Sequence, residues 1–183
     1  MSAVVSLRGQ LLIAGSALLD PNFRRTVVLV GEHTDDGALG VVLNRPTPAT
    51  VADVVPPLAT LVPPADLVFI GGPVQPEAVV ILADLEDPSL AGVPVLGSIG
   101  FLVGAVEPEA AAAVRRARVF AGYAGWGPGQ LEAELEERAW ILEPALPADV
   151  FSDDPERLWS AVLRRKGGEF RMLATMPLDP SSN

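Results

Sequence analysis

The residues most suited to chemistry lie around the single histidine of the chain. His33 follows Glu32 directly and precedes Asp35 and Asp36. An imidazole beside carboxylates can act as a general base or supply ligands to a metal ion. Adjacent strand residues point to opposite faces, however, so Glu32 and His33 converge only where the strand ends or bulges. We therefore interpret His33 as a structural residue hydrogen-bonded within a hairpin, with acid–base catalysis or metal binding as the alternatives.

A second candidate is the pair Asn44 and Arg45, which stands just before a proline. A residue that precedes proline is held in an extended conformation, so the Arg45 side chain should have a defined direction. Its guanidinium can form a fork of two hydrogen bonds with a carboxylate. The favoured interpretation is an internal salt bridge that closes the loop, and the functional alternative is an anionic ligand.

The third candidate is a glycine-rich segment, residues 122–129, which contains Trp126 and precedes Gln130. Glycines allow backbone N–H groups to approach an anion, and a helix is predicted to follow. The segment lacks both the dinucleotide and the Walker spacing, and Pro128 removes one N–H donor. We therefore expect tight packing around Trp126, with Gln130 satisfying donors at the start of the helix. A small anionic ligand is the alternative.

No other residue completes a catalytic set. Ser98 lies in a Gly-Ser-Ile-Gly sequence, which is not the G-x-S-x-G of a nucleophile elbow. The chain has no cysteine and no second histidine. The sequence therefore predicts no catalytic residue, no metal site and no cofactor. The candidate binding residues are Glu32, His33, Asn44, Arg45, Trp126 and Gln130.

The charge of the chain disfavours direct nucleic-acid binding. The net charge is −10, so the long-range field repels nucleic acid and anionic lipid. Two basic clusters are expected near helix C-termini, where they complement the helix dipole: Arg115, Arg116 and Arg118, and Arg164, Arg165 and Lys166. No apolar run reaches the roughly 20 residues of a membrane span. We expect a cytoplasmic protein that works with a protein partner and without a membrane.

The elements that must position these residues are short strands and three helices in one domain, residues 1–183. Apolar runs bounded by turn residues predict strands at 11–14, 26–30, 38–43, 67–70, 79–82, 99–103, 119–121, 140–142 and 170–175. The pair Asp36-Gly37 predicts that two of these strands form an antiparallel hairpin.

Proline and capping signals predict the helices. One should follow Pro108 and run toward Arg118, and a second should cover residues 130–138. A third should start at Asp154 and Pro155 and present an apolar face made by Leu158, Trp159, Val162 and Leu163. Irregularly interleaved strands and helices indicate an α+β fold, a mixed sheet with helices packed on it.

Three sequence blocks together resemble the YqgE/AlgH family of bacterial proteins. They are residues 20–46, which include Gly-Ala-Leu-Gly-Val-Val-Leu-Asn-Arg-Pro; residues 71–75, Gly-Gly-Pro-Val-Gln; and residues 122–135. The resemblance extends from about Gly9 to Trp159. It implies a single domain with a bifurcated or barrel-like mixed β-sheet surrounded by helices, and no agreed catalytic residues.

The resemblance, the acidic charge and the lack of a catalytic set favour a non-enzymatic regulatory or interaction protein that affects transcription indirectly. The alternative is a small-molecule binding protein or enzyme that uses a pocket around His33 and Arg45, with an anionic ligand. Direct DNA binding through the arginine clusters is a third hypothesis, which predicts strong salt dependence.

Overall fold

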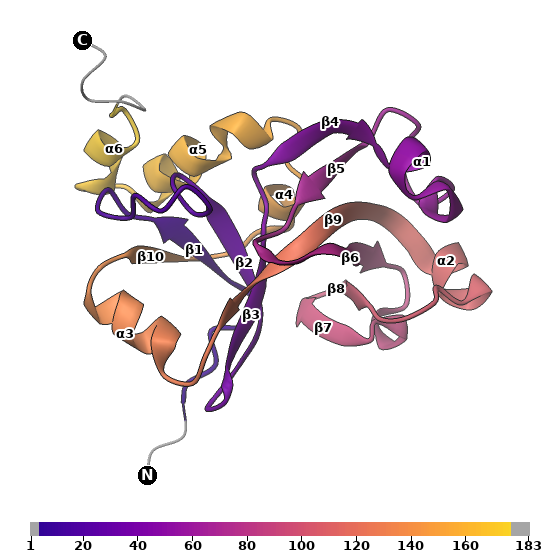
Figure 1. The fold of residues 1–183 in the computed structure, drawn as a ribbon, viewed down its shortest axis with the longest axis horizontal. Helices are drawn as coiled ribbons and strands as arrows, with labels where there is room; N and C mark the ends of the chain where they lie inside the picture. The colour runs from indigo at the N-terminus through magenta and orange to yellow at the C-terminus, as the bar shows by residue number, and fades with distance from the viewer. Residues whose placement is uncertain (1–3, 177–183) are drawn as a thin grey trace.

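The computed structural model describes residues 4–176, whose strands form one branched, mixed sheet (Figure 1). The strands are β1 (Gln10–Ala14), β2 (Val27–Thr34), β3 (Gly37–Val42), β4 (Pro46–Thr50), β5 (Leu67–Ile70), β6 (Val74–Leu85), β7 (Val93–Leu96), β8 (Ile99–Leu102), β9 (Val114–Trp126) and β10 (Trp140–Pro144).

The helices are short and lie mainly after the middle of the chain. The α-helices are α1 (Val51–Val54), α2 (Pro108–Ala113), α3 (Gln130–Glu136), α4 (Pro147–Val150), α5 (Leu158–Lys166) and α6 (Phe170–Leu173). Three 3-10 turns accompany them: η1 (Pro56–Leu58), η2 (Pro88–Leu90) and η3 (Pro155–Arg157). None of the helices in residues 4–176 has the length and apolarity of a bilayer span.

Strand β9 joins the two parts of the sheet. The strand order is β10-β1-β2-β3-β9-β6-β8-β7, and β4 and β5 branch from it because β5 pairs in parallel with β9. The other described pairings are antiparallel. The sheet does not close into a barrel, and its branch confirms the expected α+β class and bifurcated mixed sheet.

Residues 11–14 of β1 and 27–30 of β2 are all apolar, because helices cover both faces of the sheet there. One face, with Leu11 and Leu29, packs with Trp159 and Leu163 of α5. The opposite face packs with Leu131 of α3 and forms a second core, which includes Leu12, Val28, Trp126 and Trp140. The period of two along a strand thus assigns alternate residues to two different cores. A third core lies between β6, β9 and α1.

Glycines allow two segments of the backbone, at Gly71 and at Gly122, to pass very close to each other where the sheet branches, and we call this close approach the crossing. Gly71 donates its N–H to Ala121 O, and its own carbonyl accepts from Val42 N–H. A Cβ on Gly71 would lie 2.2 Å from Gly122 O, which is too close for any side chain. Gly122 has φ +74°, a left-handed conformation that glycine adopts without steric strain. The second sequence block and the start of the third therefore meet at this crossing.

The outer edge of β10 is covered by two cations from α5. Ala139 O accepts from Gly15 N–H, on the β1 side, so by alternation the carbonyls of Leu142 and Pro144 point outward. Lys166 Nζ donates to Leu142 O at 2.7 Å, and an Arg165 Nη donates to Pro144 O at 3.2 Å. The second basic cluster thus lies in the last turn of α5, as expected.

The first basic cluster does not lie on a helix, which corrects the sequence interpretation. Helix α2 ends at Ala113, and β9 begins at Val114 and pairs with β6. Arg116 and Arg118 therefore project from a strand. The alanine run permits a helix, but the chain gains more from the long β6–β9 pairing, which buries Val119 and Phe120.

The strand expected at 170–175 is also wrong, since Phe170–Leu173 forms α6. Phe170, Leu173 and Ala174 have helical spacing and pack on the same core as α5.

Strands β4 and β7 are not predicted from the sequence because each contains proline, which is compatible with an edge strand. The three expected helices begin near the predicted residues, and the face of α5 with Trp159 is buried.

Candidate binding site

His33 is a buried residue that ties three segments together. Its side chain is 2% exposed, and its Nδ1 accepts a hydrogen bond from Leu7 N–H at 3.1 Å. The ring proton therefore belongs on Nε2, which lies 2.5 Å from Glu132 Oε1 on α3. This hydrogen bond lowers the pKa of Glu132. Both ring nitrogens are engaged within the protein, in a structural arrangement.

The β2 strand bulges beside His33, yet Glu32 and His33 remain on opposite faces. The register shifts between Val30 and Glu32, so Gly31 is the extra residue. His33 faces α3, whereas Glu32 lines an open cleft on the other side of the hairpin. The two residues therefore do not form an acid–base pair.

Trp126 belongs to an aromatic cluster that one carboxylate organises. Its ring lies 6.0 Å from that of Trp140 in an edge-on arrangement, and Phe23 contacts both rings. Glu134 Oε1 accepts from Trp126 Nε1 at 3.2 Å and from Trp140 Nε1 at 3.1 Å. Glu134 was not among the predicted residues, although two buried indole N–H groups require an acceptor. The cluster is a packing unit.

Gln130 satisfies the backbone at the start of α3, as the sequence predicted. Its Oε1 accepts from Gly127 N–H at 3.0 Å, and its Nε2 donates to Glu134 Oε2 at 3.1 Å. Only residues 127–129 form a loop, because Gly122–Trp126 is part of β9. The glycine-rich segment thus serves strand pairing and helix capping.

Asn44 and Arg45 hold the loop that precedes β2. Asn44 Oδ1 accepts from Val27 N–H at 3.0 Å, and Asn44 Nδ2 donates to Arg25 O at 2.9 Å. The two Nη atoms of Arg45 donate to the carbonyls of Asn22 and Arg24, each at 2.9 Å. Burial lowers the pKa of Arg45. The loop is closed by guanidinium–carbonyl bonds in place of the expected salt bridge.

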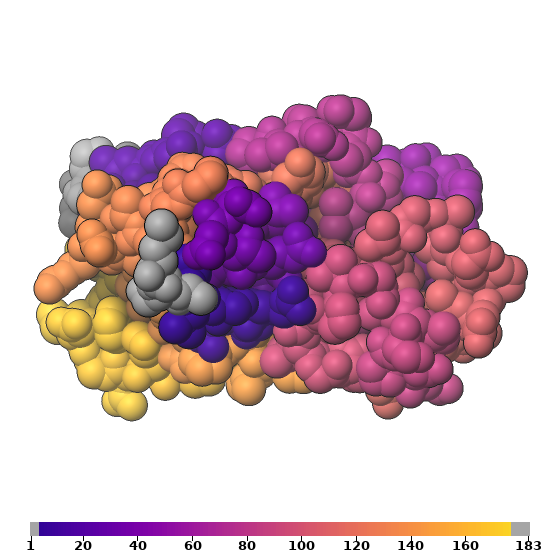
Figure 2. Space-filling view, turned by 90° about the horizontal axis from the view of Figure 1, so that it is seen from below, coloured from indigo at the N-terminus to yellow at the C-terminus, as the bar shows by residue number. Residues whose placement is uncertain are grey.

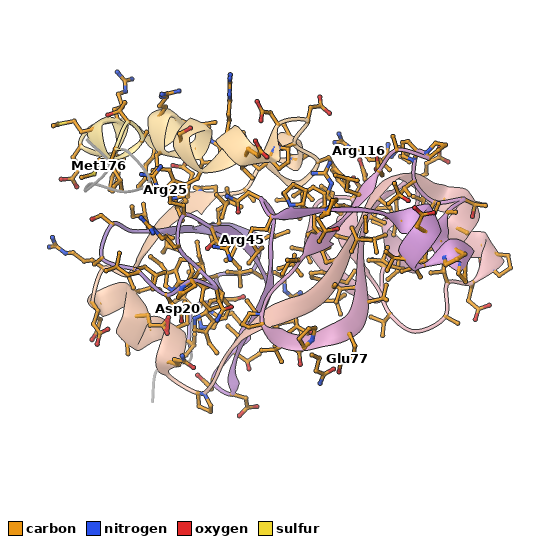
Figure 3. All side chains as sticks on the ribbon, turned by 45° about the horizontal axis from the view of Figure 1, so that its top comes forward. Asp20, Arg25, Arg45, Glu77, Arg116 and Met176 are labelled. Atoms are coloured by element: carbon orange, nitrogen blue, oxygen red, sulfur yellow. The ribbon has the colours of Figure 1, made fainter. Side chains whose placement is uncertain are left out.

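His33 and Arg45 do not share a pocket. His33 pairs with Ala38 near the hairpin turn, and Arg45 follows the far end of β3. Along β3 the distance from Ala38 to Val42 is roughly 13 Å, and Arg45 lies three residues further along the chain. In Figure 3, Arg45 lies near Arg25 and well apart from Glu77 of β6. The predicted set thus divides into Glu32 on the cleft, a cluster of His33, Trp126 and Gln130 around α3, and the Asn44–Arg45 clamp.

Glu32 lies in a cleft between the β2–β3 hairpin and the part of the sheet that contains β6, β7 and β8. The cleft has a volume of about 290 Å³ and is lined by Gly31, Glu32, Leu39, Gly40, Val41, Val79, Val80, Val93, Phe101, Leu102, Val103, Gly104 and Tyr123. Seen from the hairpin tip, Figure 2 shows the hairpin in indigo and purple beside the pink β7–β8 segment. A single ionisable carboxylate thus lies among mostly apolar residues.

Three large apolar side chains on the cleft remain accessible to solvent. Leu39 is 42% exposed, Val79 is 48% exposed and Val103 is 67% exposed. The sequence does not reveal these residues as exposed, because apolar runs predict buried strands. The local sequence holds no signal for this exposure, since Leu39 lies between Ala38 and Gly40 in an apolar run that is typical of a buried strand.

Ser98 lies outside the cleft and is engaged with a carboxylate that also pairs with a guanidinium. Ser98 Oγ donates to Asp84 Oδ1 at 2.6 Å, and Arg115 lies 3.3 Å from the same oxygen. Within residues 4–176, no three His, Asp or Glu side chains are grouped closely enough to hold a metal ion.

Comparison with known proteins identifies the family of the chain. The sequence model described as AlgH-like matches residues 11–171. The chain belongs to the AlgH-like family. A UPF0301 protein of Streptomyces coelicolor is 49% identical over an alignment of 190 positions, which covers 100% of this chain and 98% of that protein. A UPF0301 protein of Mycobacterium tuberculosis is 45% identical, over 96% of this chain and 90% of its own length.

Two solved structures from other bacteria have the same fold. The crystal structure of protein DIP2367 from Corynebacterium diphtheriae has a TM-score of 0.84 and 29% identity, with 96% of this chain and 95% of that chain covered. The solution structure of AlgH from Pseudomonas aeruginosa has a TM-score of 0.67 and 33% identity, with 97% of both chains covered. The resemblance noted from the sequence is confirmed.

The sequence blocks that identify an AlgH-like chain meet at the cleft. Glu32 and Val41 come from the first block, and Tyr123 comes from the third. Val74 of the second block pairs with Tyr123 in the β6–β9 ladder. The same glycines that let the chain cross itself therefore also bring the cleft residues of this AlgH-like protein together.

Proposed function

We propose that this protein is a non-enzymatic interaction protein whose cleft between the β2–β3 hairpin and the β6–β8 strands receives an apolar segment of a protein partner. The observation that supports this proposal is the cleft itself, which has exposed Leu39, Val79 and Val103 and a single acidic residue, Glu32. Accessible apolar side chains grouped in a hollow are typical of interaction sites. An effect on transcription would then be indirect, through that partner.

The state of the histidine supports a non-enzymatic role. A general base needs a ring nitrogen that can reach a substrate. Both nitrogens of His33 are bonded within the protein, and the ring is buried away from the cleft. Glu32 has no imidazole, thiol or second carboxylate beside it among the residues that line the cleft.

The contacts of the arginines support indirect rather than direct action on DNA. Arg118 lies over the Phe69 ring and donates to the carbonyls of Val150 and Ser152. Arg115 and Arg116 lie beside Asp84. A phosphate would compete with these contacts, and the net charge of −10 opposes its binding at long range.

The test is site-specific photo-crosslinking of the full chain in its host cell. A benzophenone amino acid at position 103 should crosslink to a discrete protein, whereas the same group at Leu19 should not. Leu19 is 70% exposed and does not line the cleft, so it is the matched control. The crosslinked protein should then bind purified wild-type protein, and a Leu39→Ser, Val103→Ser variant should bind it at least tenfold more weakly.

The proposal fails if crosslinking at position 103 gives no product beyond that of the Leu19 control. It also fails if the purified protein turns over a substrate and a folded His33→Asn variant loses that turnover.

A further inference from the structure

We infer that the occupant of the cleft is an extended apolar segment of a partner protein that carries a lysine or arginine at one end. This inference rests on the proposed function and adds the chemistry of the partner. It depends on three hollows that follow one another along one groove and on the charges that line them.

The three hollows lie next to one another, because neighbouring hollows share lining residues, and we call them together the groove. The central hollow is the cleft described above. Glu32 and Leu39 also line a second hollow, of about 280 Å³, at the hairpin tip. Val79, Leu102 and Gly104 also line a third hollow, of about 510 Å³, beside η1 and the segment after β8. The groove therefore runs from the hairpin tip across β6 and β8 toward η1.

Charge is concentrated at one end of this groove. The hollow at the hairpin tip is lined by two acidic residues, Glu32 and Asp36. The hollow beside η1 is lined by uncharged residues, among them Val55, Leu58 and Val106. None of the described residues that line the three hollows is arginine or lysine. A ligand with a cation at one end and apolar groups at the other matches this arrangement.

The net charge of the protein favours the same ligand. At −10, the whole molecule attracts a basic segment from a distance and increases its rate of encounter. The short-range contact with Glu32 then determines which end of the segment lies at the hairpin tip.

The shape of the groove favours an extended peptide over a small molecule. A pocket that binds a small molecule usually encloses 70–90% of the ligand surface. This groove is open along its rim, since Val79 is 48% exposed and Val103 is 67% exposed. An extended chain can place successive side chains in successive hollows, and so gain affinity along an open groove.

The experiment is selection from a phage library of random dodecapeptides on the immobilised full-length protein. Recovered peptides should contain one lysine or arginine next to a stretch of apolar residues. They should bind the Leu19→Ser control but not the Leu39→Ser, Val103→Ser variant.

Replacing both groove carboxylates, Glu32→Gln and Asp36→Asn, should weaken binding of such a peptide roughly threefold to tenfold at low salt. Glu136→Gln, which removes an exposed carboxylate on α3, should leave binding unchanged.

Each other outcome overturns the inference, and the outcomes differ in what they imply for the groove and for the proposed function. Cleft-dependent peptides without a basic residue, or with acidic ones, would overturn the inference and leave the proposed function standing. Failure to recover any cleft-dependent peptide, together with binding of dodecyltrimethylammonium below its micelle concentration, would assign the groove to a small amphiphilic cation. Failure of both probes would overturn the inference, and the photo-crosslinking experiment would decide the proposed function separately.

Discussion

His33 Nε2 lies 2.5 Å from Glu132 Oε1, across 99 positions of sequence, and this contact joins the β2–β3 hairpin to α3. Because Nδ1 of the same ring accepts from Leu7 N–H, the imidazole also holds the segment that leads into β1. A residue that looked suited to catalysis is thus the link between the N-terminal segment, the hairpin and a helix.

Removal of the imidazole should destabilise the fold in a graded way. His33→Ala leaves Leu7 N–H and Glu132 without their partner and should lower the free energy of unfolding by about 2–3 kcal/mol. His33→Asn retains an oxygen near the position of Nδ1 and should lose less. Urea denaturation of both variants measures the difference. Equal losses would show that the hydrogen bond from Leu7 contributes little.

The Glu132 carboxylate should make stability depend on pH in the acid range. Its pKa in the folded protein is lowered below the ordinary value of 4.5, chiefly by the hydrogen bond from His33. A lowered folded-state pKa means that the unfolded chain binds the proton more readily, so the contribution is present above pH 4.5 and is lost as the pH falls through the folded pKa.

This pH dependence is measured as the stability difference between wild-type protein and Glu132→Gln across pH 3 to 7. The difference should shrink toward the acid end. Glu136→Gln serves as the control on the same helix, and an equal pH-dependent difference for that variant would contradict the assignment to Glu132.

Glu134 should be essential for the packing of the two tryptophans. Glu134→Leu removes the acceptor shared by Trp126 and Trp140, whose side chains are buried, and should cost about 2 kcal/mol. The emission maximum of the tryptophan fluorescence should also shift in this variant. Glu134→Gln retains one oxygen and should be milder, so an identical loss in both variants would argue against the shared hydrogen bond.

Two glycines of the sequence blocks should differ greatly in their tolerance of alanine. A Cβ at Gly71 would lie 2.2 Å from Gly122 O, a backbone atom, so Gly71→Ala should cost about 3 kcal/mol or prevent folding. At Gly125 the nearest atoms would be 3.7 Å away, so Gly125→Ala should change the free energy of unfolding by about 0.5 kcal/mol at most. Thermal unfolding measures both, and similar losses would contradict the crossing described at Gly71.

The sequence allowed prediction of those elements whose signal is local. The Asp-Gly turn, the proline at the start of α2 and the apolar face around Trp159 depend on neighbouring residues, and each was found where expected. Strand β9 was underestimated because its alanines and arginines favour a helix locally, and only pairing with distant β6 makes the strand favourable.

The site was harder to predict, because its geometry depends on which strands meet. The sequence identified Glu32, His33 and Arg45 as polar residues of interest, but their separation follows from the position of each along the hairpin. Leu39, Val79 and Val103 become neighbours only through the branched sheet, and no local pattern marks them as exposed.

The two cations that α5 places over β10 have a consequence for how copies of this protein behave together. An approaching strand would find the carbonyls of Leu142 and Pro144 already occupied by Lys166 and Arg165. Growth of the sheet by addition of a foreign strand is thereby hindered at that end, as charged edge residues commonly do in natural β proteins. Crowded copies of the protein are thereby discouraged from stacking through β10 into fibrils.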